Sequence, residues 1–81
     1  MIYEMYSMKD ELSGYMYPIP FMKEEIAKRY LKEQVENNIT LKTSPEDFSL
    51  WKIGTFDSET GIFENLKEHE LIERGKNYAK V

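Results

Sequence analysis

The sequence predicts a single α+β domain: a small antiparallel sheet of three to five strands with one amphipathic helix packed on a face, in the order β-β-α-β-β. One segment repeats apolar residues at helical spacing, whereas others alternate them as strands do. Turn-forming residues separate these segments. No internal repeat or linker divides the 81 residues, so we expect one domain over residues 1–81.

Two strands are expected before the helix. Residues 2–8 are rich in aromatic and unbranched apolar types, and alternation places Tyr3 and Met5 on one face and Ile2, Tyr6 and Met8 on the other, which is typical of a strand covered in part on both faces. A polar segment that ends at Gly14 fits a hairpin connection to a second strand over residues 15–19. Because Pro18 and Pro20 cannot donate to a ladder, this second strand is expected at a sheet edge.

The helix is expected over residues 21–36. Its apolar residues form one stripe, which comprises Met22, Ile26, Ala27, Tyr30, Leu31 and Val35. Most of its cations lie four residues from a carboxylate, as Lys28 does from Glu24. This spacing favours a self-paired, solvated face over a phosphate-binding one.

A strand over residues 48–56 and a returning strand from Ile62 are expected after the helix, with Gly54 as a bulge or kink. Residues 57–61 predict a turn closed by Gly61 at positive φ. Residues 68–73 fit either a short strand or a helical turn. Residues 74–81 are expected to form a loose basic tail.

Simple alternation divides the side chains of the 48–56 strand between two faces. One face is expected to bear Phe48, Leu50 and Phe56, and the other Trp51 and Ile53. One of these faces would pack under the helix.

Composition limits the classes of function. The chain has no cysteine, which excludes a disulfide framework, a Cys-ligated zinc site and thiol chemistry. His69, the one histidine, lies between Glu68 and Glu70, which indicates a surface residue more than a metal ligand. The four glycines are scattered singly, so no phosphate-cradling loop is expected. We therefore expect no enzyme, no cofactor and no metal, and neither a signal peptide nor a membrane span.

Two stretches resemble a known family. The first is Ile2-Tyr3-(x)2-Tyr6 followed by Tyr15-(x)2-Pro18 and a helix, and the second is the run PEDFSLWKIGTFD over residues 45–57 with Thr60-Gly61. Together they resemble the small nonstructural protein of the gokushoviruses, which are single-stranded DNA phages of the microvirus group. The resemblance spans nearly the whole chain, although residues 68–76 lack the family's Pro-rich entry to this segment. It implies a role in genome replication, as a DNA-binding protein or a factor that favours single-stranded progeny genomes, in the cytoplasm of the infected bacterial host.

The aromatic residues are the main candidates for binding. Eleven of the 81 residues are Tyr, Phe or Trp, and the strand face with Trp51 either meets a partner chain or offers a base-stacking platform. The alternative is that all of them are core or dimer contacts. Candidate nucleic-acid-binding residues are Trp51, Lys52, Tyr15, Tyr17, Arg74, Lys76 and Lys80.

Two functions remain open at this point. The first is binding of single-stranded DNA as an accessory of phage genome replication. The alternative is a protein-interaction regulator that binds the viral replication initiator or a host replication protein without touching DNA. Clustered cations around Trp51 would favour the first, and an apolar patch rimmed by carboxylates would favour the second. A homodimer is also expected, because one helix cannot cover aromatic residues on both sheet faces.

Overall fold

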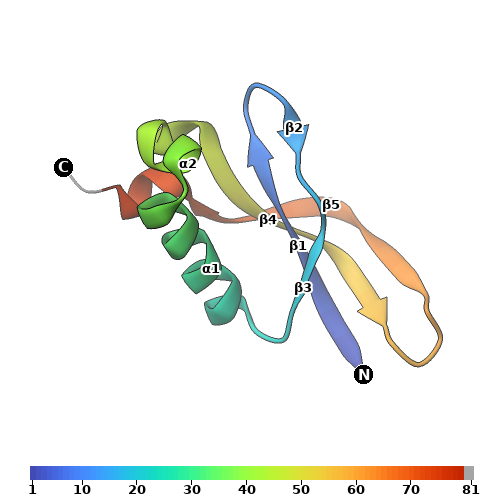
Figure 1. Cartoon of the computed structure of the whole chain (residues 1–81). Helices are drawn as coiled ribbons and strands as arrows, with labels where there is room; N and C mark the ends of the chain where they lie inside the picture. The colour runs from blue at the N-terminus through green and yellow to red at the C-terminus, as the bar shows by residue number, and fades with distance from the viewer. Residues whose placement is uncertain (80–81) are drawn as a thin grey trace.

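The computed structural model describes residues 1–79, which form a five-stranded antiparallel sheet with helices on one face (Figure 1). The strands β1 (Ile2–Asp10), β2 (Gly14–Tyr15), β4 (Phe48–Asp57) and β5 (Phe63–Arg74) are ordered β2-β1-β4-β5. β3 (Ile19–Phe21) pairs with β1 antiparallel. The expected class, a small antiparallel sheet with helix packed on one face, is confirmed.

Two short strands replace the single second strand expected over residues 15–19. β2 pairs with the end of β1, and β3 pairs with Glu4, Met5 and Tyr6. Both lie on the edge of β1 opposite β4, as the two prolines predict. Residues 68–73, which fitted either a strand or a helical turn, belong to β5.

Two helices cover the sheet, whereas one was expected. They are α1 (Glu24–Asn37) and α2 (Ile39–Thr43). Between them Asn38 caps α2, since the Thr40 backbone N–H donates to Asn38 Oδ1 at 3.0 Å. A five-residue helix is too short to give a periodic pattern, which is why the sequence did not predict α2. α1 begins three residues later than expected because Phe21 belongs to β3.

The core lies between α1 and the sheet. Its buried residues are Tyr6, Met8, Ala27, Leu31, Val35, Leu41, Phe48 and Leu50. Two 3-10 turns, η1 (Pro45–Asp47) and η2 (Gly75–Tyr78), close its end. Tyr78 packs against this core and Gly75 is buried, so residues 75–78 are not the loose tail that was expected. Lys80 lies outside the described residues.

A bulge at Ile53 reverses the alternation of side chains along β4. Met5 pairs with Gly54 and Tyr6 with Lys52, which leaves Ile53 without a partner in β1. Because cross-strand partners share a face, side chains beyond the bulge change faces relative to simple alternation. Phe56 therefore lies on the face of Trp51, and its expected place beside Phe48 and Leu50 was wrong.

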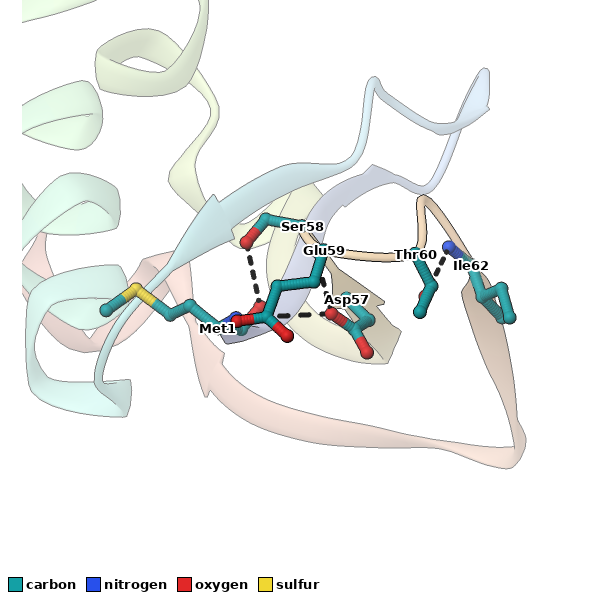
Figure 2. A network of polar contacts seen from close by, with 6 residues as sticks. All are labelled: Met1, Asp57, Ser58, Glu59, Thr60 and Ile62. Carbon is teal, nitrogen blue, oxygen red and sulfur yellow. Dashed lines mark hydrogen bonds and ion pairs between the residues drawn. The ribbon is translucent and has the colours of Figure 1, made fainter.

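The β4–β5 hairpin extends away from the helices and gives the molecule an elongated shape of 44 × 22 × 17 Å (Figure 1). Its turn is closed by Gly61 at φ 75°, which confirms the predicted left-handed conformation. Figure 2 shows the chain start beside this turn, where the Ser58 backbone N–H donates to the Met1 carbonyl at 3.0 Å. The Glu59 backbone N–H donates to Asp57 Oδ1 at 2.9 Å and lowers the pKa of that carboxyl.

Candidate nucleic-acid interface

Four side chains from four strands meet on the sheet face that the helices leave uncovered, which we call the open face. They are Lys9 of β1, Tyr15 of β2, Trp51 of β4 and His69 of β5, and we call them the aromatic cluster. The Tyr15 ring meets Trp51 edge to face with centroids 6.4 Å apart, and it meets His69 at 5.3 Å. Lys9 Nζ lies 5.5 Å from the centroid of Tyr15 and 5.7 Å from that of Trp51, within the range of a cation–π contact.

Hydrogen bonds orient the rings of the cluster. Trp51 Nε1 donates to Ser49 Oγ at 2.7 Å. One ring nitrogen of His69 lies 3.2 Å from the Tyr15 hydroxyl, and the other lies 3.3 Å from Asn65 Oδ1. These contacts hold the three rings in defined orientations while Tyr15 keeps 44% of its surface exposed. The cluster is thus an ordered but accessible aromatic surface.

Charge is divided between the two faces of the sheet. Lys9, Ser49 and Arg74 are cross-strand partners in one row across β1, β4 and β5, so both cations lie on the open face. Every carboxylate at a paired position of these strands lies on the helix-side face instead, and these are Glu4, Asp10, Asp57, Glu64, Glu70 and Glu73. The net charge of −4 is therefore not spread evenly, and the paired positions of the open face carry cations but no carboxylate.

On the helix-side face, Lys52 forms an ion pair with a carboxylate of the same face. Lys52 Nζ lies 3.2 Å from Glu4 Oε1, and the Tyr6 hydroxyl donates to the other oxygen of Glu4 at 2.5 Å. The Tyr6 hydrogen bond and the Lys52 charge lower the pKa of Glu4. Burial and the neighbouring Glu4 carboxylate raise the pKa of Tyr6. Lys52 is thus committed to an ion pair on the face opposite Trp51.

The structure brings some of the predicted site residues together and separates others. Tyr15, Trp51 and Arg74 share the open face, whereas Lys52 does not. Tyr17 is 88% exposed and lines a groove with Tyr30 and Leu41 on the helix side. Lys76 lies in η2.

Sequence reasoning missed two members of the cluster, Lys9 and His69. Lys9 falls in the segment expected to be a hairpin connection, but β1 continues to Asp10. Extending the alternation of β1 by two residues would have placed Lys9 on one face with Tyr3 and Met5. His69 shows no local pattern, because it reaches Tyr15 only through the order of the strands.

Within residues 1–79 there is no group of three or more His, Cys, Asp or Glu side chains that could hold a metal ion. The same residues include no helix that is long and apolar enough to cross a membrane.

The fold and this face define a class of small sheet proteins, with helices on one face and, on the other, an aromatic surface that bears Lys9 and Arg74. A family model described as the phage ORF5 protein matches residues 3–78 of the chain. The chain therefore belongs to the phage ORF5 protein family, and it is a phage protein made in the host cell. This match confirms the phage origin that the sequence resemblance implied. No curated protein and no solved structure matches the chain.

Proposed function

We propose that this phage protein binds single-stranded DNA through the open face of its sheet, as a nonstructural accessory of gokushovirus-type genome replication in the host cytoplasm. It acts by binding and catalyses no reaction. The observation that supports this function is the aromatic cluster, with Lys9 over its rings and Arg74 in the same cross-strand row as Lys9. Cations clustered around Trp51 were the feature that favours DNA over a protein partner.

The chemistry of the open face favours single strands over duplexes. Unpaired bases offer π-faces that stack on aromatic side chains whatever the base sequence, whereas a duplex hides those faces. Lys9 and Arg74 can contact phosphates beside the stacked bases. Since only two cations share this face at paired positions, affinity depends weakly on salt, with a logarithmic slope of about −1.4.

Trp51 is the one tryptophan of the chain and reports directly on the cluster. Titration with oligothymidylate at low salt is expected to quench its fluorescence. In anisotropy measurements with a labelled oligothymidylate, Tyr15→Leu is expected to weaken binding by about 1–3 kcal/mol, because one stacking ring is lost. Tyr17→Leu is the matched control, since Tyr17 is exposed on the helix side, and it leaves the affinity unchanged.

Two results would reject this function. One is the absence of quenching at low salt by a folded protein. The other is an equal loss of affinity in Tyr15→Leu and Tyr17→Leu.

A second candidate function is binding of the viral replication initiator or a host replication protein. The observation that favours it is a separate exposed apolar surface formed by the neighbouring Met16 and Tyr17. A groove of about 260 Å³ lies beside it, between the β2–β3 connection and α1. Pull-down from infected cells with and without nuclease distinguishes the two functions. Partners that survive nuclease but are lost in Tyr17→Ala would support the protein-binding function.

A further inference from the structure

We infer a second base-stacking subsite on the open face, formed by Tyr3, Phe56 and Phe63 at the outer end of the β4–β5 hairpin. The inference rests on the proposed function, and the ligand is a further part of the same single-stranded DNA. It extends the binding surface from one aromatic cluster to a path along the sheet.

The three aromatic side chains form one row across the sheet. Tyr3 pairs with Phe56 and Phe56 pairs with Phe63, so all three lie on the same face. The bulge at Ile53 places Phe56 on the open face and completes the row. Phe63 keeps 43% of its surface exposed, and no helix covers this end of the hairpin (Figure 1). A ring at this position remains available for stacking.

A glycine lets the second subsite approach the first. An ideal Cβ on Gly54 would lie 3.0 Å from the Phe63 ring, so the ring occupies space that any other residue would fill. The next residue toward the aromatic cluster is Asn65, the partner of Gly54, and its Oδ1 lies 3.3 Å from the His69 ring. His69 in turn meets Tyr15. Phe63 is thus connected to the aromatic cluster through neighbouring side chains.

The distribution of charge favours binding of the DNA strand on the open face of the hairpin. At the same end, the helix-side face presents Asp57 and Glu64, which line a shallow depression with Ile2 and Ile62. Carboxylates there repel phosphates, whereas no carboxylate occupies a paired position on the open face. A polyanion that stacks on Trp51 is therefore directed along the aromatic side.

The spacing of the two subsites sets the length of DNA that reaches both. Phe56 lies four cross-strand steps from Trp51, which corresponds to about 13 Å along the strand. At a base spacing of about 3.4 Å this is roughly four nucleotides. An oligothymidylate of three nucleotides occupies one subsite, and a decamer spans both.

The test compares decamer and trimer binding in Phe63→Leu, which keeps an apolar side chain in the hairpin but removes the ring. We expect decamer affinity to fall by about 5- to 100-fold, the effect of losing one stacking ring, while Trp51 quenching by the decamer at saturation persists. Trimer affinity is expected to change less. Ile62→Ala is the matched control, since it removes an exposed apolar side chain on the acidic side of the same turn, and it leaves decamer affinity unchanged.

A second variant reports on the subsite directly. Trp51→Phe combined with Phe63→Trp moves the one indole of the chain to the outer end of the hairpin. Quenching of that indole by the decamer supports the subsite, and its absence overturns it. Unchanged decamer affinity in Phe63→Leu with normal Trp51 quenching would reject the second subsite and leave the proposed function intact. Absence of Trp51 quenching in the unaltered protein would reject both.

Discussion

Lys52 Nζ and Glu4 Oε1 lie 3.2 Å apart on the helix-side face of the sheet, so the charge of Lys52 is neutralised on the face opposite Trp51. Lys9, by contrast, lies over the Tyr15 and Trp51 rings on the open face, which is the opposite face of the sheet from Lys52. Replacing either lysine with a neutral residue changes the net charge by the same amount. The two residues are therefore a matched pair for testing which face binds DNA.

Lys9→Gln is expected to weaken binding of oligothymidylate and to flatten its salt dependence by about 0.7 in logarithmic slope, the share of one phosphate contact on a single strand. Lys52→Gln is expected to leave that slope unchanged, because Lys52 neutralises Glu4. Anisotropy titrations at several salt concentrations measure both slopes. Equal slopes in the two variants would show that only net charge matters.

Gly54→Ala is expected to destabilise the protein by about 1–3 kcal/mol, in the range of overpacked sites. An ideal Cβ there would lie 2.3 Å from the Glu64 carbonyl oxygen, so the backbone of β5 must move. Urea denaturation followed by circular dichroism measures the change in the free energy of unfolding. An unchanged midpoint would contradict the close approach of β4 and β5 at this position.

Gly61→Ala is expected to lower the free energy of unfolding by about 1 kcal/mol, for a different reason. The space around Gly61 is open, but its φ of 75° is strained for alanine. Gly61→Asn is expected to be milder, since asparagine tolerates the left-handed conformation. Thermal unfolding of the two variants tests this order, and a neutral alanine variant would exclude the turn geometry.

Stability is expected to fall at both ends of the pH range because of Glu4 and Tyr6. The folded pKa of Glu4 is below its ordinary value of 4.5, so the folded state favours the carboxylate. This stabilisation is present above that value and is lost as pH falls through the folded pKa. The folded pKa of Tyr6 is above its ordinary value of 10.0, so its contribution is lost as pH rises beyond that value.

The variant Glu4→Gln isolates the acidic part of this dependence. It keeps an acceptor for the Tyr6 hydroxyl but cannot titrate, so its unfolding free energy is expected to decrease less than that of the unaltered protein between about pH 6 and pH 3. Urea denaturation at each pH measures the difference. Identical acid dependence of the two proteins would contradict the role of Glu4.

Several features were determined by the sequence itself, because they depend on residues close together in the chain. The stripe through Ala27, Leu31 and Val35 predicted the helix face that is buried. Pro18 and Pro20 predicted an edge position, and Gly61 predicted its own positive φ. Tyr15 and Trp51 were both candidate binding residues, and the structure places their rings in contact.

The tertiary structure alone decided which residues share the open face. Lys52 follows Trp51 directly in the chain but pairs with Glu4 on the other face, whereas Lys9 and His69 join Trp51 from distant strands. The bulge at Ile53 moved Phe56 to the open face. A strand alternates with a period of two, so one unpaired residue reverses every side chain beyond it. Where that residue falls depends on contacts between strands about fifty positions apart, which no local pattern in the sequence encodes.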